Sequence, residues 1–174
     1  HYGINEFIIC CGYKGYVIKE YFSNYYKHLT DMTINLCNND IKYHKNDVEN
    51  WKITLVNTGI ETMTGGRIKR VKDYIQNEPF MLTYGDGVAD VNLNDLLKFH
   101  QDHGKLMTLT SVQPEARFGA IISNEKGLIK KFKEKPKGDG EWINGGFMVC
   151  QPEILNYIEN DETVLEQKPL SNLA

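Results

Sequence analysis

A carboxylate between two glycines, Asp86 in the run Tyr84-Gly85-Asp86-Gly87, is the strongest candidate for chemistry in this chain of 174 residues. The apolar segment that begins at Phe80 predicts a strand that ends at this point. Glycines on both sides let a phosphate chain and a hard cation approach the backbone. Mg²⁺ prefers one or two carboxylates together with phosphate oxygens. The run indicates either such a site, or a turn in which Asp86 bonds only its own backbone.

Charged residues close a second predicted strand, in the run Phe132-Lys133-Glu134-Lys135-Pro136. Alternation along a strand places Lys133 and Lys135 on one face and Glu134 on the other. Glu134 could accept hydrogen bonds from sugar hydroxyls, and the ammonium group of Lys135 could bind a phosphate. The alternative interpretation is an edge strand that lysine and proline protect against aggregation.

Other glycine-containing segments lie at predicted helix and strand boundaries. Thr64-Gly65-Gly66-Arg67 opens a helix, where free backbone N–H groups could bind an anion or where the residues only cap the helix. Phe118-Gly119 and Asn144-Gly145-Gly146 lie at strand ends, where a ligand could approach closely. A Walker A loop, a dinucleotide fingerprint, a zinc-binding histidine pair and a G-x-S-x-G elbow are all missing from the sequence. Covalent hydrolysis is therefore not indicated.

The elements that must position these residues alternate between strands and helices. Short apolar runs predict strands, the first of them (Glu6–Cys11) buried on both faces, and helical spacing of apolar residues predicts helices. The predicted strands are 6–11, 33–37, 52–56, 80–84, 105–112, 119–123, 128–134 and 144–150. The predicted helices are 15–29, 64–75, 93–103 and 153–158, and the chain is expected to end inside a further helix, at 170–174. The polar stretch 38–50 is expected to be a turn or hairpin tip. This order predicts an α/β fold with a mixed, mostly parallel, Rossmann-like sheet flanked by helices.

Composition is that of one globular domain, and we expect a single catalytic domain over residues 1–174. Hydrophobic residues make up 41%, charged residues 25%, and the formal net charge is −3. Binding to nucleic acid or to an acidic membrane by charge needs a broad basic excess, so neither partner is expected. No apolar stretch approaches the roughly 20 residues that cross a bilayer. Four cysteines without a C-x-x-C pair favour a reduced, cytoplasmic protein.

Taken together, the motifs resemble those of the sugar nucleotidyltransferase family. The segments that carry the resemblance are FIICCGYKGYVIKEYF, VNTGIETMTGGRIKRV, TYGDGVADVN, FKEKPKGDGEWINGGF and the closing EQKPL. Two features, the MTGGR run before GDG and the spacing from EKP to INGG, resemble those of the cytidylyl branch of the family. The resemblance implies an enzyme that converts CTP and glucose 1-phosphate into CDP-glucose and pyrophosphate with Mg²⁺. It also implies a role in dideoxyhexose and cell-surface glycan synthesis, and assembly into a homo-oligomer.

The same resemblance implies roles for individual residues. Asp86 matches the magnesium-binding aspartate, Glu134 the acceptor for sugar hydroxyls and Lys135 the lysine that holds the sugar phosphate. Asp86 and Lys135 are then the catalytic residues, in an in-line attack by the sugar phosphate that needs no enzyme nucleophile. The other substrate-binding residues implied are Gly85, Gly119, Asn144 and Gly145, with Thr64, Gly66 and Arg67 in the segment that reads the base.

The sequence departs from the family at both ends. Members of the family begin with a G-G-x-G-T-R loop that holds the triphosphate, and this sequence contains no such loop. The family's second metal-binding Asp would lie beyond the last residue of this sequence. We therefore expect the fold to be truncated at both ends, as in an internal fragment of a longer protein. Two alternatives stay open. One is an inactive sugar-phosphate-binding domain, and the other is a uridylyl- or thymidylyltransferase or a glycosyltransferase with a similar nucleotide-binding sheet and an Asp-metal site.

Overall fold

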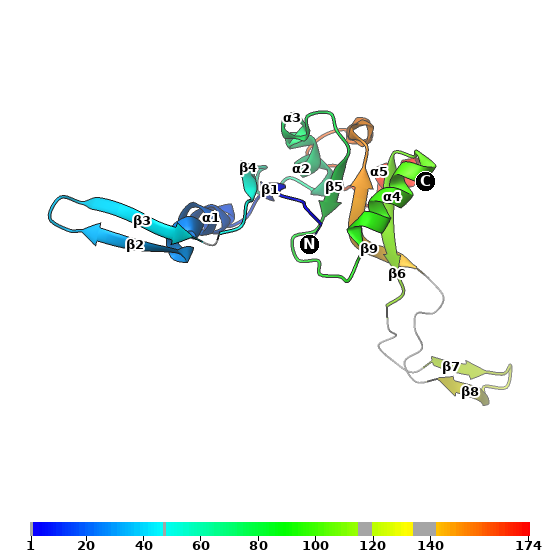
Figure 1. Cartoon of the computed structure of the whole chain (residues 1–174). Coiled ribbons are helices and arrows are strands. Elements are labelled where there is room, and N and C mark those ends of the chain that lie inside the picture. Colours follow the sequence, from blue (N-terminus) through cyan, green and yellow to red (C-terminus); the bar gives the residue numbers. More distant parts are fainter. Residues whose placement is uncertain (1, 47, 115–119, 134–141) are drawn as a thin grey trace. The chain divides into compact units, whose positions relative to one another are not determined.

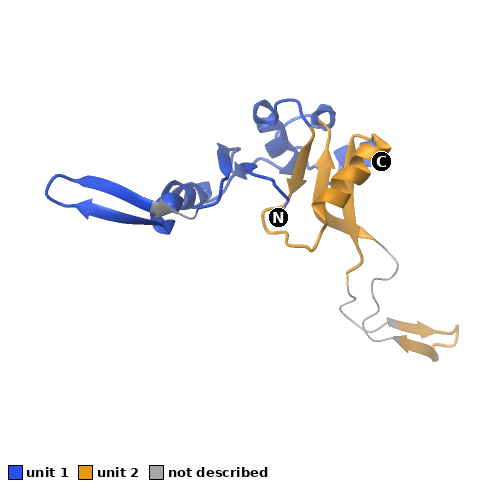
Figure 2. Cartoon of the chain, viewed as in Figure 1, with its two compact units in different colours: residues 1–78, 152–174 blue, residues 79–151 orange. Residues whose placement is uncertain are grey.

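The computed structural model describes the chain apart from residues 1, 47, 115–119 and 134–141 (Figure 1). The chain forms two compact units (Figure 2). Residues 1–78 and 152–174 make the first, and residues 79–151 make the second. The second unit is thus an insertion into the sequence of the first, between its third helix and its C-terminal segment.

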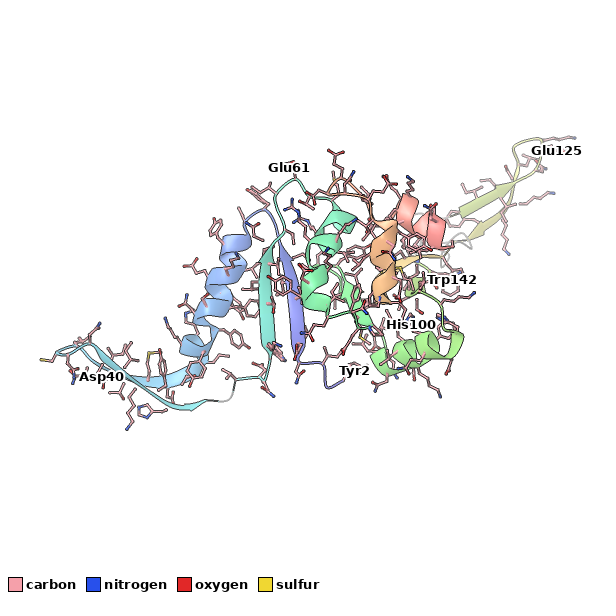
Figure 3. The ribbon with its side chains drawn as sticks, turned by 90° about the horizontal axis from the view of Figure 1, so that it is seen from above. Tyr2, Asp40, Glu61, His100, Glu125 and Trp142 are labelled. Carbon is pink, nitrogen blue, oxygen red and sulfur yellow. The ribbon has the colours of Figure 1, made fainter. Side chains whose placement is uncertain are left out.

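The first unit contains a parallel strand pair, β1 (Glu6–Cys11) and β4 (Lys52–Asn57), with Glu6 opposite Lys52 and Cys11 opposite Asn57. Two strands also form an antiparallel hairpin, β2 (Thr30–Asn35) and β3 (Asp40–Asn46), and Asp40 is labelled at its turn in Figure 3. The helices of this unit are α1 (Gly15–Leu29), α2 (Thr64–Arg70), α3 (Lys72–Ile75), the 3-10 helix η1 (Pro152–Tyr157) and α5 (Lys168–Leu173).

Helices α2 and α3 present an apolar stripe to the C-terminal segment of the first unit. The buried residues are Ile68, Val71 and Ile75 from the helices, with Ile154, Ile158 and Leu165 from that segment. The three helix residues, spaced three and four positions apart, thus form one buried stripe, as the helical spacing of apolar residues predicts. The single helix predicted over 64–75 is interrupted at Val71, because its φ of −100° and ψ of 9° lie outside helical geometry.

The second unit is built on a three-stranded antiparallel sheet. β9 (Ile143–Cys150) lies in the middle, between β5 (Phe80–Thr83) and β6 (Met107–Val112). β7 (Ala120–Ser123) and β8 (Ile129–Lys133) form a separate hairpin. Cys150 at the end of β9 is fully buried, and burial raises the pKa of its thiol to about 12, so it is a core residue.

Helix α4 (Leu93–His103) covers the sheet of the second unit and is anchored by a buried histidine. Its first turn is capped by Asn92, and Gly104, with a φ of +63°, ends it. His100, labelled in Figure 3, is 1% exposed, with Nδ1 2.8 Å from Thr108 Oγ1 and Nε2 2.9 Å from Gln151 Nε2. His100 is therefore a hydrogen-bonded core residue.

The α/β class and the mixed strand directions are confirmed, but three details differ from expectation. Among the described strands only β1 and β4 pair in parallel, because β9 returns between β5 and β6 with the opposite direction. β3 lies in a stretch expected to be a turn, since its Asp, Lys and His residues masked the alternation with Ile41 and Tyr43. β1 is not buried on both faces: Phe7 and Ile8 are each 37% exposed, because β1 pairs with one described strand alone.

Candidate active site

The turn after β5, which we call the Asp86 turn (residues 84–87), is open to solvent. The chain leaves the strand at Thr83, and the N–H of Gly87 donates to the carbonyl of Tyr84 at 3.2 Å. Asp86 and Gly85 are exposed. A Cβ added at Gly85 would meet no atom within 4 Å. Packing does not require a glycine there, and the space on that side of the Gly85 backbone is open.

Strand β9 brings Asn144 to this turn, since β5 pairs with β9 up to Thr83 opposite Phe147. The side-chain amide of Asn144 donates to the hydroxyl of Tyr84 at 3.3 Å. Its Oδ1 accepts from the N–H of Gly146 at 2.9 Å. The Asp86 turn and the Asn144-Gly145 segment are separate candidates in the sequence. In the structure they lie together at one end of the sheet, where β5 stops and β9 starts.

Tyr84 is the residue of this site that the sequence reasoning missed. Its ring covers Gly146, where an added Cβ would lie 3.0 Å from Cδ2, and Gly146 has a φ of +84°. Glycine is needed there for both the close approach and the backbone geometry. The sequence carries a signal for it, because Tyr84 stands at the strand end directly before Gly85.

Gly145 is explained by packing between β9 and β6. A Cβ there would lie 2.9 Å from Thr110 Oγ1 and 3.1 Å from Val112 Cγ1. The register of the two strands also shifts at this level, between Leu109 and Ser111. The predicted contact of Gly145 with a sugar stays a prediction.

In the first unit, the predicted base-reading segment is held by what we call the α2 clasp, residues 63–70 against residues 158–166. The N–H groups of Gly65 and Gly66 donate to the carbonyl of Thr163, at 2.9 and 3.3 Å. The N–H of Met63 donates to the carbonyl of Asp161 at 2.8 Å. Because these donors already have acceptors, the interpretation that free N–H groups of Gly65 and Gly66 bind an anion is wrong.

Both glycines of the clasp are required by close packing. A Cβ at Gly65 would lie 2.7 Å from the carbonyl oxygen of Thr163, and one at Gly66 would lie 2.5 Å from that of Asp161. The opposing atoms belong to the backbone and cannot turn aside. Gly66 therefore has a structural reason to be glycine, independent of any substrate.

Thr64 joins the clasp through its side chain. Its hydroxyl donates to Glu166 Oε2 at 2.6 Å and accepts from the N–H of Leu165 at 2.9 Å. Glu166 opens the EQKPL run, one of the segments that carry the family resemblance. No local pattern could have shown this pairing, because the two residues are 102 positions apart.

Arg67 links the α2 clasp to the carboxyl ends of the parallel strands. Its Nη1 donates to Thr58 Oγ1 and to the carbonyl of Gly59, each at 2.8 Å, and its Nη2 donates to the carbonyl of Ile60 at 3.1 Å. A Cβ at Gly12, just after β1, would lie 2.5 Å from the same Nη1. In open α/β sheets ligands bind beyond these strand ends, and the base-reading role of Arg67 stays a prediction.

The last residues of α2 hold the clasp by charge. Arg70 Nε donates to Asp161 Oδ1 at 2.8 Å, and Nη2 to Oδ2 at 2.5 Å, in the two-pronged geometry typical of arginine and carboxylate. This pairing lowers the pKa of the Asp161 carboxyl and raises that of the Arg70 guanidinium. Lys69 donates to the carbonyls of Ile158 and Glu159.

The predicted site residues thus form two described groups, with Thr64, Gly66 and Arg67 in the first unit and Gly85, Asp86, Asn144 and Gly145 in the second. Gly119, Glu134 and Lys135 lie outside the described residues. Within the described part of the chain, no cluster of three or more His, Cys, Asp or Glu residues could hold a metal ion. Nor does a helix in that part have the length and apolar character needed to span a membrane.

Residues 3–171 match the model of the nucleotidyl transferase family. The chain belongs to this family. It is 52% identical to glucose-1-phosphate cytidylyltransferase of Salmonella typhi over 99% of this chain and 67% of that protein. It is also 44% identical to a probable glucose-1-phosphate cytidylyltransferase of Bacillus subtilis, over 100% of this chain and 68% of the relative. These relatives confirm the resemblance to the cytidylyl branch of this family of nucleotidyltransferases.

Solved structures show the same fold at low identity. HddC from Yersinia pseudotuberculosis has a TM-score of 0.61 and 18% identity, covering 95% of this chain and 64% of that one. A UDP-glucose pyrophosphorylase complexed with UDP-glucose has a TM-score of 0.55 and 16% identity, covering 98% and 70%. The chain spans about two thirds of the length of these curated relatives and structures.

Proposed function

We propose that this protein transfers the cytidylyl group of CTP to glucose 1-phosphate, giving CDP-glucose and pyrophosphate. The observation that carries the proposal is the 52% identity to a glucose-1-phosphate cytidylyltransferase over 99% of the chain. Identity at this level along the whole chain favours this function over a uridylyl- or thymidylyltransferase and over an inactive binding domain. We further propose a cytoplasmic homo-oligomer that supplies cell-surface glycan synthesis.

The reaction needs no nucleophile from the protein. A phosphate oxygen of glucose 1-phosphate attacks the α-phosphorus of CTP, and the bond from that phosphorus to the oxygen bridging to the β-phosphorus breaks. The electron pair leaves with pyrophosphate. Both reactants are anions that repel each other, so the protein contributes by positioning them and by placing cationic groups beside them. Lys135 is the residue proposed to hold the sugar phosphate.

Asp86 is the residue proposed to hold Mg²⁺. The described residues fit such an ion, because the carboxylate of Asp86 is exposed in a turn where Gly85 leaves open space. One protein carboxylate is enough when phosphate oxygens complete the coordination. When bound, Mg²⁺ supplies charge neutralisation for the transferred phosphate.

The sugar is proposed to lie at the end of the sheet where β9 starts, next to Asn144. Its amide is oriented by the hydroxyl of Tyr84 and the N–H of Gly146, so the edge next to the Asp86 turn is polar and fixed. Gly85 and Gly145 are proposed to complete this side of the sugar site. Gly119 is also proposed to contact the sugar, and Glu134 to accept hydrogen bonds from its hydroxyls. Thr64, Gly66 and Arg67 are proposed to serve the cytosine base.

The test uses the protein expressed from its complete gene. Pyrophosphate release is measured with glucose 1-phosphate and each of CTP, UTP and dTTP, and the product is identified by mass spectrometry. We expect release that requires both CTP and glucose 1-phosphate, with CDP-glucose as product. Release with UTP or dTTP in preference to CTP would reject the cytidylyl assignment, and no release from a folded protein with any of the three would reject transfer itself.

A further inference from the structure

The hydroxyl of Thr64 has only one hydrogen-bonding position left. A threonine hydroxyl carries one donor hydrogen and two acceptor lone pairs. An ionised carboxylate can only accept, so the hydroxyl must donate its hydrogen to Glu166 Oε2, 2.6 Å away. A backbone N–H can only donate, so one lone pair accepts from Leu165, at 2.9 Å. The chemistry of the two partners thus fixes both directions, and what remains is one acceptor lone pair.

The α2 clasp holds Glu166 in this arrangement. Leu165, next to it, is 1% exposed, and the segment before it is bonded to α2 through Thr163 and through the Arg70–Asp161 pair. The backbone that carries Glu166 is therefore held in place, and its side chain contacts Thr64 from a fixed position. Thr64 itself is exposed, so its remaining lone pair is accessible.

We propose that Glu166 determines base specificity by keeping the Thr64 hydroxyl an acceptor. This inference rests on the proposed function, in which Thr64 belongs to the segment that reads the base. Cytosine presents an amino donor at position 4, whereas thymine, and likewise uracil, presents a carbonyl acceptor there. A hydroxyl that can only accept forms a hydrogen bond with the amino group of cytosine. With uracil or thymine, it would place its lone pair against a lone pair of the carbonyl oxygen, which is repulsive. Specificity then comes from the mismatch with the wrong base as well as from the bond to the right one.

The test compares CTP with UTP in the enzyme expressed from its complete gene. The quantity measured is the ratio of kcat/KM for CTP to that for UTP, with glucose 1-phosphate saturating. In Glu166→Ala the hydroxyl can rotate and donate, so we expect the ratio to fall roughly tenfold or more. The KM for CTP should rise while the KM for glucose 1-phosphate stays unchanged, a split that general loosening of the fold would not produce.

Variants of Thr64 test whether Glu166 acts through the Thr64 hydroxyl. Thr64→Ser keeps the hydroxyl and should keep the ratio, whereas Thr64→Val removes it and should lower the ratio roughly tenfold. The double variant Thr64→Val with Glu166→Ala should be no less selective than Thr64→Val alone, because Glu166 acts through this hydroxyl. A further, additive loss in the double variant would overturn the proposal.

Glu162→Ala is the matched control, since Glu162 is an exposed acid in the same segment, four residues before Glu166. Its ratio should equal that of the unsubstituted enzyme. If Glu166→Ala fails to fold, Glu166→Asp, which retracts the carboxylate by one methylene, should lower the ratio instead. An unchanged ratio in a folded Glu166 variant overturns the Glu166 assignment only. Failure of the unsubstituted enzyme to use CTP at all would instead overturn the proposed function.

Discussion

The α2 clasp and the Asp86 turn contain similar motifs, Thr64-Gly65-Gly66-Arg67 and Tyr84-Gly85-Asp86-Gly87, yet they use their glycines in opposite ways. In the clasp, an added Cβ at Gly66 would lie 2.5 Å from a backbone oxygen. In the turn, an added Cβ at Gly85 would meet nothing within 4 Å. The first glycine lets two segments pack together, and the second leaves a carboxylate open to solvent.

Scaffold and reactive surface can be distinguished in this chain by the partners of their polar groups. The clasp places its polar groups in bonds that join segments far apart in the sequence, such as Arg70 with Asp161 and Thr64 with Glu166. The turn exposes Asp86, while the Tyr84 hydroxyl beside it accepts from the side-chain amide of Asn144. Substitutions of the tightly packed glycines and the ion pair of the clasp should therefore change stability first, and those in the turn should change turnover first.

The largest effect is expected from Asp86→Asn in the complete enzyme. The substitution keeps the shape of the side chain and removes the charge proposed to hold Mg²⁺. We expect turnover to fall by about 10²- to 10³-fold or more, because a group that neutralises transition-state charge is lost. The thermal unfolding midpoint should not change. Steady-state kinetics over a range of Mg²⁺ concentrations, with calorimetry beside them, make the measurement.

Asp102→Asn serves as the control for this prediction, since Asp102 is an exposed carboxylate on α4 of the same unit. It should leave turnover unchanged. Near-normal turnover of Asp86→Asn at saturating Mg²⁺ would contradict the metal assignment and weaken the contrast between the two regions.

The next effect compares Gly66→Ala with Gly85→Ala. Alanine at Gly66 gains up to about 1 kcal/mol of helix propensity. It also forces a methyl group against the backbone of Asp161, and overpacking of this kind costs about 1–3 kcal/mol or more. We expect a net loss of stability in Gly66→Ala, and a change within about 0.5 kcal/mol in Gly85→Ala.

Turnover should show the reverse order, because a methyl group at Gly85 enters the proposed pocket. Urea unfolding and kinetics of the two variants test both halves. Equal losses of stability in the two variants would show that both glycines are needed for packing, which would contradict the proposed difference between the clasp and the turn.

Local patterns were sufficient to predict most elements of the fold. The helices 15–29 and 93–103 were predicted at the bounds that α1 and α4 have, because their apolar residues recur at helical spacing between glycine or asparagine boundaries. The turn after β5 was predicted from the glycines that end an apolar run. β3 was missed because its polar composition outweighed its alternation, and the break at Val71 left no mark in a stripe that continues on both sides of it.

The site was harder to predict, because its bonds connect distant parts of the chain. Thr64 was chosen from the sequence, but its partner Glu166 and the close approach of Gly66 to Asp161 come from tertiary packing. The same holds for Tyr84 and Asn144, which only the pairing of β5 with β9 brings together. A motif shows which residues can react, whereas the partners that fix their direction follow from the register and packing of whole elements.

A smaller effect is expected from Tyr84→Phe, which keeps the ring over Gly146 and removes the hydroxyl that accepts from Asn144. Loss of one neutral hydrogen bond should raise the KM for glucose 1-phosphate by about 2- to 10-fold and leave the KM for CTP unchanged. Kinetics with each substrate varied in turn provide the measurement. An equal rise in both Michaelis constants would show that Tyr84 supports the fold and does not orient the sugar side.

The smallest effect concerns the exposed ion pair of the clasp, tested by Asp161→Asn. Arg70 lowers the pKa of the folded-state carboxyl below its ordinary value of 3.8. The pair therefore contributes stability above that value, and the contribution disappears as the pH falls through the lower folded-state pKa. We expect the variant to be slightly less stable than the parent at neutral pH and equal to it in strong acid, so its stability should vary less below pH 4. Urea midpoints across this range test the prediction, with Glu162→Gln as the control. A constant difference between Asp161→Asn and the parent at every pH would mean that the clasp depends on the shape of this side chain and not on its charge.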